Sequence, residues 1–487
     1  MPPVSSRRRN VSGQLKHDDR QTGHVPGPTT SVMWFRRDLR LRDHPALASA
    51  ANADRVVALF VLDDALRRPS GTPRLAFLYR SLRDLDAELR QHGGELVVRR
   101  GTPENIVPAV AQDAGAISVH VSADFGPYGA ARDERVEAAL GEVPLIRTGS
   151  GYAVSPGRIV KSDSQPFRVF TPFYRMWLAH GWPAPAVSDP ARISWRRGIS
   201  GVTVPQDPKL PARLVLPDAG EQAARTAWRR FRQAGLRRYS DDRDRPDLDH
   251  TSRMSVYLKY GAIHPRTLLA DLGGHDETFR RELAWREFYA AVLHFWPDSA
   301  RDYFVPSMAR MPYATGEIAD AHFAAWTAGR TGYPIVDAGM RQLLAEGWMH
   351  NRVRMIVASF LVKDLHIEWT RGARHFMRHL VDADLASNQH GWQWTAGTGT
   401  DAAPYFRVFN PISQGKKFDP DGSYVRRYVP ELRGLSGAAA HEPWQRPAGV
   451  PADYVERIVD HAAERTRSLA NYRNLRAGES NGHVTDD

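Results

Sequence analysis

The 487-residue sequence contains no cysteine. Disulfides, thiolate zinc sites and Cys-ligated iron–sulfur clusters are therefore excluded, and the fold must hold without such cross-links. The sequence also lacks an apolar run long enough to span a bilayer, and its N-terminus lacks the apolar core of a secretory signal. We therefore expect a cytoplasmic protein that does not bind membranes.

Several catalytic patterns are missing as well. No GxGxxG follows the first predicted strand, so the ordinary NAD fingerprint is absent. There is no serine nucleophile elbow and no cysteine nucleophile, which leaves hydrolysis with little support. His375 and His379 have the spacing of two helical metal ligands, but the sequence shows neither the Glu of HExxH nor an evident third ligand. We predict no metal site.

Positive charge is in excess, with 66 Lys and Arg against 55 Asp and Glu, a formal net charge of +11. Such a balance favours polyanionic partners, nucleic acid among them. Residues 1–30 include Arg7, Arg8 and Arg9 but no apolar periodicity, which predicts a disordered basic tail. A solvated tail is the simpler interpretation, and weak contact with nucleic acid is the alternative.

The length of the chain indicates two or three domains. Between residues 31 and 150, β-branched runs alternate with helical periodicity, which predicts an α/β domain with a mostly parallel, Rossmann-like sheet covered by helices on both faces. Ligands are then expected beyond the carboxyl ends of the strands. The predicted strands are Val32–Phe35, Arg55–Leu62, Glu95–Val98, Ile117–Val121 and Val143–Ile146.

The remaining chain divides into three parts. Residues 151–220 are rich in Pro, Gly and Ser and predict a long surface connector. Residues 221–475 show helical patterns almost throughout and predict an all-α domain. Residues 476–487 predict a disordered tail.

Three helical segments and one loop carry polar groups suited to a flat ligand. Residues 251–255 place hydroxyls and an arginine at a helix N-terminus, which suits an anion, although an ordinary N-cap explains the same residues. Helical spacing places Glu282, Trp285 and Tyr289 on one face of a second helix, and Asn351 and Met355 on one face of a third. For either helix, an amphipathic core helix is the alternative. The run 382–394 combines carboxylates, an amide and two indoles and indicates the wall of a pocket for an aromatic redox cofactor, or else an aromatic core loop.

Combined with four longer blocks, these motifs resemble the photolyase and cryptochrome family, specifically class I DNA photolyases that repair cyclobutane pyrimidine dimers. The resemblance extends from Val32 to about Arg473. Its most specific blocks are residues 34–40 together with Asp43, and residues 331–337, 347–352 and 388–406. It implies an α/β antenna domain followed by an all-α domain that binds FAD.

The resemblance implies roles for individual residues in binding FAD. The cofactor-binding residues would be Tyr239, Thr251, Ser252, Arg253, Ser255, Arg354, Asp382, Asp384 and Asn388. Among them, Arg354 and Asp382 would form a charged pair beside the isoalloxazine, and Asp384 would lie near the ribityl chain and ring edge. Asn388 would control flavin N5.

The resemblance also implies a reaction in which light excites reduced FAD, an electron passes to a flipped-out dimer, the cyclobutane ring splits, and the electron returns. Glu282 would hydrogen-bond the dimer and stabilise its radical anion. The pocket would be lined by Trp285, Trp394, Asn351 and Met355. DNA would be contacted by Arg243, Trp285, Arg352, Arg407 and Gln414.

Two features differ from parts of the family. Trp392 and Trp369 match the inner residues of its electron-transfer chain, while Tyr313 stands near the position of the usual outer Trp, with Trp326 as an alternative. Tyr128 and Gly129 replace the Asn-Glu pair of folate-binding members. The resemblance therefore implies 8-hydroxy-5-deazaflavin as the antenna chromophore in preference to methenyltetrahydrofolate.

Three other functions remain as alternatives. A (6-4) photolyase would resemble this chain but carry histidines in place of Asn351 and Met355. A cryptochrome-type blue-light photoreceptor would usually carry a long C-terminal extension, and a flavin-dependent redox enzyme would need a nicotinamide fingerprint. We expect a photolyase that acts as a monomer on DNA containing pyrimidine dimers.

Overall fold

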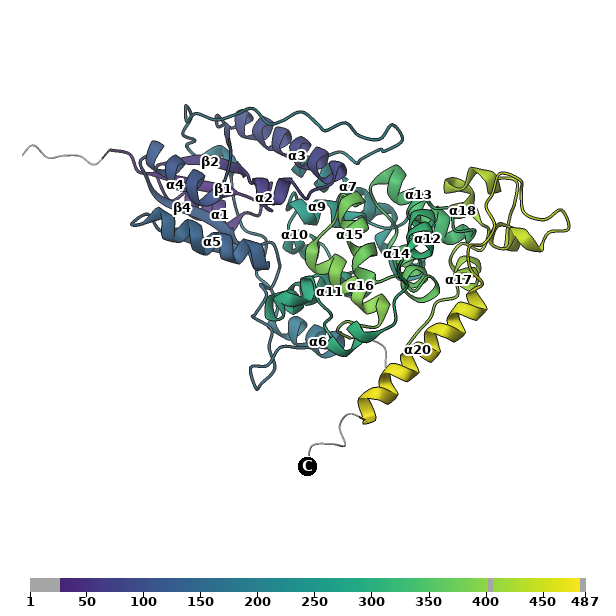
Figure 1. The fold of residues 1–487 in the computed structure, drawn as a ribbon. Helices are drawn as coiled ribbons and strands as arrows, with labels where there is room; N and C mark the ends of the chain where they lie inside the picture. Colours follow the sequence, from purple (N-terminus) through teal and green to yellow (C-terminus); the bar gives the residue numbers. More distant parts are fainter. Residues whose placement is uncertain (1–26, 402–405, 482–487) are drawn as a thin grey trace, which may run out of the picture.

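A computed structural model gives the structure of residues 27–401 and 406–481. Figure 1 shows an α/β part packed against a larger helical part. The predicted basic tail lies outside the described residues up to residue 26, and Thr30 already belongs to the first strand. No helix among the described residues is long and apolar enough to cross a bilayer.

Five parallel strands form one sheet, as the sequence predicted for this part of the chain. Their order, which the sequence did not predict, is β3-β2-β1-β4-β5. The chain moves outward from the central β1 to β2 and β3, and then crosses to β4 and β5 on the other side of β1. The crevice beyond the carboxyl ends of β1 and β4 is thus a topological switch point, where α/β sheets bind ligands. The strands are β1 Thr30–Phe35, β2 Arg55–Leu62, β3 Leu96–Arg100, β4 Ala116–Ala123 and β5 Leu145–Ser150.

Alternating side chains of β1 bury both faces of the sheet. Val32 and Trp34 lie in one apolar cluster with residues of α4 and α5, while Met33 and Phe35 lie in another with residues of α1 and α3. Apolar residues on both sides of each strand are typical of a parallel sheet covered by two helical layers. The helices of this part are α1 Pro45–Ala50, α2 Asp64–Arg67, α3 Thr72–Gln91, α4 Pro103–Asp113 and α5 Pro127–Leu140.

The segment 151–220 is more ordered than the sequence predicted. It contains a helix, α6 Phe170–His180, which buries Phe170, Phe173, Tyr174 and Trp177. These aromatic residues have the spacing i, i+3, i+4 and i+7 of an amphipathic helix, a signal that the surrounding Pro and Gly residues obscured. Farther along, the connector hydrogen-bonds the sheet, because Arg196 N lies 2.8 Å from Val56 O and Val202 N lies 2.7 Å from Val98 O.

From Glu221 the chain is helical, as predicted. The last helix reaches Asn481, so the tail predicted from residue 476 begins at least six residues too early, and residues 482–487 lie outside the described residues. The helices are α7 Glu221–Ala234, α8 Tyr239–Asp242, α9 Met254–Tyr260, α10 Pro265–Ala270, α11 Glu277–Phe295, α12 Glu317–Ala328, α13 Pro334–Glu346, α14 Asn351–Ser359, α15 Trp369–His379, α16 Leu385–Ala396, α17 Pro411–Phe418, α18 Ser423–Tyr428, α19 Ala438–His441 and α20 His461–Asn481. A π-helical segment, η6 Phe360–Asp364, follows α14 directly.

The two parts share a continuous core. The apolar cluster under α1 and α3 continues into α7, α9 and α11, and a second cluster fills the centre of the helical part. The turn after β1 is joined to the end of α9, since Leu39 N lies 3.1 Å from Tyr260 O and Arg40 Nη1 lies 3.0 Å from Gly261 O. The carboxyl end of β1 is thereby fixed against the helical part.

Candidate active site

The turn that begins α9 contains Arg253, an arginine with only some of its hydrogen-bond donors paired. Arg253 has φ of 52°, in the left-handed region, and its guanidinium lies 4.4 Å from the centroid of the Trp348 ring. Two acids contact it, Glu346 at 2.9 Å and Asp249 at 3.0 Å. Its Nε is buried and has no hydrogen-bond partner among the described residues. Together with the half-buried hydroxyls of Thr251 and Ser252, this donor suits an anionic ligand such as a phosphate.

The predicted pair of Arg354 and Asp382 is present. Asp382 Oδ2 accepts from Arg354 Nη2 at 2.8 Å and from Ser255 Oγ at 2.6 Å. The other carboxylate oxygen, Oδ1, is buried without a hydrogen-bond donor among the described residues. Buried acceptors are rarely left unsatisfied, so this oxygen fits a ligand N–H or O–H. Three residues predicted to bind FAD from separate segments thus meet at one point.

Two further residues predicted to bind FAD, Asn388 and Tyr239, lie on other helices, α16 and α8. Asn388 is half-buried in the first turn of α16, and its Nδ2 donates to Ala373 O at 3.2 Å and Gln389 Oε1 at 2.8 Å. Tyr239 packs edge-on against Phe279 with ring centroids 5.2 Å apart. Contact of either residue with FAD stays a prediction.

Glu282 and Trp285 share one face of α11, as predicted. Glu282 Oε1 pairs with Arg243 Nη1 at 2.8 Å. Burial raises the pKa of the Glu282 carboxyl, and Arg243 opposes this shift. Trp285 stacks on Phe170 of α6 with ring centroids 3.7 Å apart and an interplanar angle of 8°. The connector therefore supports a residue predicted to contact the substrate, which the sequence did not indicate.

The other predicted substrate residues lie on α14 and α16. Asn351 is exposed, and its Nδ2 lies 3.9 Å from the Sδ of Met355 one turn later. Trp394 is half-buried and donates from Nε1 to Asp401 O at 3.1 Å. Because α11 and α14 both pack against α16, the helices that carry these residues form one unit. Their contact with a substrate stays a prediction.

Two of the cations predicted to contact DNA, Arg243 and Arg352, have acidic partners within the protein. Arg352 makes two contacts with Asp244, at 3.1 and 2.7 Å, and its guanidinium covers the Phe418 ring at 4.5 Å. Arg407 has an exposed side chain, and its carbonyl accepts from the buried Lys363. Gln414 is half-buried on α17. Pairing lowers the local charge of Arg243 and Arg352, so a DNA role for these residues stays a prediction.

The aromatic residues predicted to transfer electrons lie on two routes. Trp369 contacts Tyr303 with ring centroids 6.0 Å apart, and Tyr303 contacts Tyr313 at 6.4 Å. Tyr303 thus connects two of the predicted residues, although the sequence did not single it out. Trp392 contacts Trp326 at 6.1 Å, so the alternative residue also lies beside the inner tryptophan.

A cavity of roughly 580 Å³ lies between the two parts, at the switch point of the sheet. Asp384, predicted near the flavin, lines this cavity, caps α16 by accepting from Ser387 N at 3.1 Å, and pairs with Arg37 at 2.5 Å. Burial lowers the pKa of the neighbouring Lys259 to about 7, and Arg37 adds to this effect. The contact of Asp384 with FAD stays a prediction.

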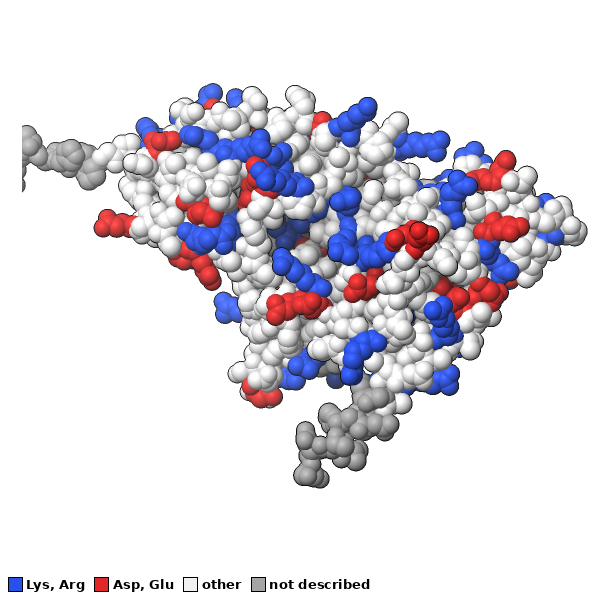
Figure 2. All heavy atoms as spheres, in the orientation of Figure 1, with Lys and Arg blue, Asp and Glu red and all other residues white. Residues whose placement is uncertain are grey.

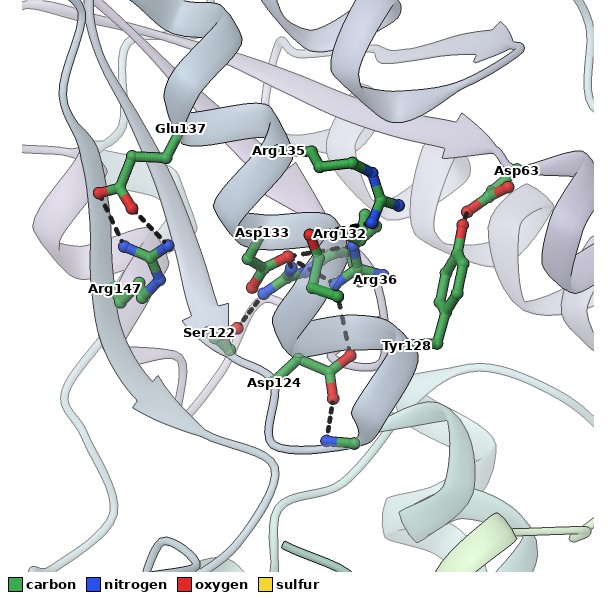
Figure 3. Close-up of polar contacts among 12 residues, drawn as sticks. Arg36, Asp63, Ser122, Asp124, Tyr128, Arg132, Asp133, Arg135, Glu137 and Arg147 are labelled. Carbon is green, nitrogen blue, oxygen red and sulfur yellow. Dashed lines mark hydrogen bonds and ion pairs between the residues drawn. The ribbon is translucent and has the colours of Figure 1, made fainter. Parts of the chain in front are cut away.

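Figure 3 shows the wall of this cavity at the start of α5. Arg36 and Arg132 both contact Asp133, and Arg132 also pairs with Asp124 at 3.3 Å. Tyr128 and Asp63 also line the cavity, and the Tyr128 hydroxyl donates to the Asp63 carboxylate. The segment that the sequence linked to an antenna chromophore therefore does face a cavity.

Comparison with known proteins agrees with this arrangement. Residues 31–191 match the DNA photolyase family, and residues 279–474 match the FAD binding domain of DNA photolyase. The chain is 42% identical to a deoxyribodipyrimidine photo-lyase of Streptomyces griseus over 90% of this chain and 98% of that protein. It is 39% identical to one of Escherichia coli K12 over 93% of this chain and 100% of that protein.

Solved structures give the same result. A bacterial class III photolyase from Agrobacterium tumefaciens superposes with a TM-score of 0.83 at 34% identity, covering 96% of this chain and all of that one. An archaeal photolyase from Sulfolobus tokodaii, described with two FAD molecules, superposes with a TM-score of 0.81 at 29% identity, covering 92% of this chain and all of that one. The chain belongs to the photolyase and cryptochrome family.

Proposed function

We propose that this chain is a class I photolyase, which binds FAD and repairs cyclobutane pyrimidine dimers in DNA under light, acting as a cytoplasmic monomer. The observation that carries the proposal is the Ser255–Asp382–Arg354 contact set, in which Asp382 Oδ1 is buried and unpaired among the described residues. Relatives more than one third identical over nearly their whole length are named deoxyribodipyrimidine photo-lyases.

FAD, when reduced and bound, would supply the photoexcited electron donor. The chain's own residues bind and orient it: Arg253 attracts its phosphates, Arg354 and Asp382 hold its ring edge, and Asn388 offers a neutral amide. Glu282 accepts hydrogen bonds from the flipped dimer, and Trp285 and Trp394 cover its apolar faces. Photolyases flip the lesion out of the stack, which costs less for damaged bases.

The residues at the mouth of this site favour cyclobutane dimers over (6-4) lesions. Asn351 and Met355 contact each other where a (6-4) enzyme would place histidines for proton transfer. Neither an amide nor a thioether transfers protons near neutral pH. The cryptochrome alternative has weaker support, because the named relatives are photo-lyases.

We further propose that the cavity between the two parts holds a second, light-harvesting chromophore. Our assignment is 8-hydroxy-5-deazaflavin rather than methenyltetrahydrofolate, because most of the segment 125–133, which resembles the deazaflavin-binding segment, lines the cavity. The lining residues of this segment are Phe125, Gly126, Pro127, Tyr128, Gly129 and Arg132. The Sulfolobus tokodaii relative, described with two FAD molecules and a novel light-harvesting cofactor, supports a tricyclic occupant.

Repair of defined oligonucleotides tests the function. Purified protein with reduced FAD is illuminated with blue light in the presence of a thymine-dimer oligonucleotide, and a (6-4) oligonucleotide serves as the parallel substrate. We expect restoration of the dimer strand alone, and none in the dark. Absence of dimer repair with fully reduced flavin bound would favour the photoreceptor alternative.

A further inference from the structure

The cavity between the two parts contains far more positive than negative side chains. Its lining includes seven cations, Arg36, Arg37, Arg74, Arg132, Lys259, Arg374 and Arg378, but only three acids, Asp63, Asp124 and Asp384. A cavity of roughly 580 Å³ is within the range of small-molecule sites. An excess of cations around a cavity favours an anionic ligand, because the three acids of the lining balance only part of this positive charge.

Six of these seven cations fall into two groups, and the seventh, Lys259, neighbours the pair of Arg37 and Asp384. In the first group, the buried side chains of Arg36 and Arg132 share Asp133 (Figure 3). Arg37, whose side chain is 38% exposed, pairs with Asp384, so all three guanidiniums have carboxylate partners within the protein. These pairs surround the apolar residues that would contact a flat ring, including Trp34, whose ring lies 5.1 Å from the Arg132 guanidinium.

The second group has no such partners. Arg74, in the first turn of α3, donates from Nη2 to Pro69 O at 3.3 Å, and its Nε is buried with no partner among the described residues. Burial lowers the pKa of this guanidinium, and no carboxylate compensates. On α15, Arg374 and Arg378 are exposed, and within residues 27–401 and 406–481 the structure pairs neither of them with an acid.

These three arginines converge on one rim. Arg374 and Arg378 are four residues apart and therefore share a face of α15. The loop before α3 rests on the end of that helix, since a Cβ at Gly71 would overlap the carbonyl of Arg378. Figure 2 shows Lys and Arg side chains gathered around the crease between the two parts of the molecule.

We propose that the second chromophore carries a phosphorylated side chain, with its tricyclic ring inside the cavity and its phosphate held at the rim by Arg74, Arg374 and Arg378. This inference rests on the proposed antenna function of the cavity. The ligand class is a flavin-type or deazaflavin-type ring with a polyol side chain that ends in phosphate. A neutral polyol would leave all three guanidiniums without a counter-charge, whereas arginine forks match phosphate oxygens closely.

Paired ligands that differ only in the phosphate test the proposal. FAD-saturated, full-length protein is titrated with riboflavin and FMN, and separately with 8-hydroxy-5-deazariboflavin and its 5′-phosphate, by fluorescence anisotropy. We expect the phosphate to tighten binding about tenfold or more for the preferred ring, as for a charge-assisted contact. The ring that binds more tightly shows whether the chromophore is a flavin or a deazaflavin. Added salt should weaken the preference for the phosphorylated ligand.

Variants on α15 test whether the rim arginines cause the tighter binding of the phosphorylated ligands. The double change Arg374→Gln and Arg378→Gln should reduce FMN or deazaflavin phosphate binding to the level of the unphosphorylated ligand. Arg371→Gln, on the same helix, is the matched control and should keep the preference, because Arg371 already pairs with Asp320 at 2.9 Å.

Three results would overturn the inference: equal binding of both members of each ligand pair, a preference that survives in the double variant, or no binding of any of the four ligands. Repair by wild-type protein under light absorbed by FAD itself needs no second chromophore. If that repair is intact, failure of the ligand tests overturns this inference alone and leaves the repair function in place.

Discussion

Glu282 combines partial burial with a single opposite charge. Its carboxylate pairs with Arg243 at 2.8 Å, and its side chain keeps 29% exposure on the face predicted to receive the substrate. Burial raises the pKa of this carboxyl, and the positive charge of Arg243 opposes that shift. Arg243 thereby favours the ionised form of Glu282 while leaving part of the carboxylate accessible. A carboxylate in this state can accept hydrogen bonds from an incoming base.

We predict that Glu282→Gln lowers the repair yield or DNA affinity about tenfold to a hundredfold, because a charge-assisted hydrogen bond contributes about 1.5–3 kcal/mol. The neutral amide keeps the shape of the side chain, so bound FAD should be retained. Repair yield, dimer affinity and the flavin absorption spectrum are the measurements. Glu277→Gln, in the first turn of the same helix, is the control and should repair normally; loss of flavin from the Glu282 variant would show that its role lies in cofactor binding.

The family resemblance predicted the polar groups of the site better than their partners. It implied a charged pair of Arg354 and Asp382, and the structure places these two residues in contact. It did not indicate that Ser255 donates to the same carboxylate. The pairing of Arg37 with Asp384 was not predictable, because it joins residues 347 positions apart that meet only after both parts have folded. Tyr303 was missed for the same reason: nothing in its neighbourhood indicates that its ring lies between Trp369 and Tyr313.

At the scale of elements, α15 and α16 pack closely against each other, and this packing positions Trp392, one of the inner tryptophans of the predicted electron-transfer chain. Trp392 of α16 lies over Gly372 of α15, one turn from Trp369, and a Cβ at Gly372 would overlap its ring and the side chain of Leu361. Phe376 holds the same ring edge-on at 4.9 Å. The absence of a side chain at position 372 therefore lets Trp392 sit against the helix.

We predict that Gly372→Ala displaces the Trp392 ring, destabilises the protein by roughly 1–3 kcal/mol through overpacking, and slows photoreduction of bound FAD. Denaturant unfolding and flavin bleaching under blue light measure the two effects. Gly391→Ala is a matched control on α16, because its added Cβ would meet no atom within 4 Å. Normal photoreduction in the Gly372 variant would place the electron route elsewhere.

Elements with strong periodicity were predicted well, and those that depend on context were not. β-branched runs predicted all five strands, whose observed bounds differ by at most four residues at an end. Helix α6 was missed because Pro and Gly residues flank its aromatic face, and its stability comes from packing against α11 rather than from local preference. The C-terminal tail was predicted to begin before the observed end of α20, because the Gly and Ser residues near residue 480 are typical of a frayed terminus.

At the scale of the whole molecule, the two parts are joined by buried charge as well as by apolar packing. Asp384 caps α16 in the helical part and pairs with Arg37, which follows β1 in the other part. Burial opposes its ionisation, but Arg37 and Lys259 outweigh this and hold the pKa of the Asp384 carboxyl below its ordinary value. The pair therefore stabilises the docked arrangement when Asp384 is ionised.

We predict that Asp384→Asn, which keeps the cap but removes the charge, lowers the free energy of unfolding at pH 7 by roughly 1–3 kcal/mol, moderated by solvent screening of the half-exposed Arg37. A lowered folded-state pKa gives stability that is present above the ordinary carboxyl pKa of 3.8 and is lost as pH falls toward the folded value. The difference in the free energy of unfolding between wild type and variant should thus narrow progressively below about pH 4.

Asp189→Asn is the control, because it removes a comparable cap charge whose ion pair with Arg192 is exposed. It should change the free energy of unfolding by less than about 0.5 kcal/mol. A difference for Asp384→Asn that stays constant from pH 7 to pH 3 would show that its cause is not this charge.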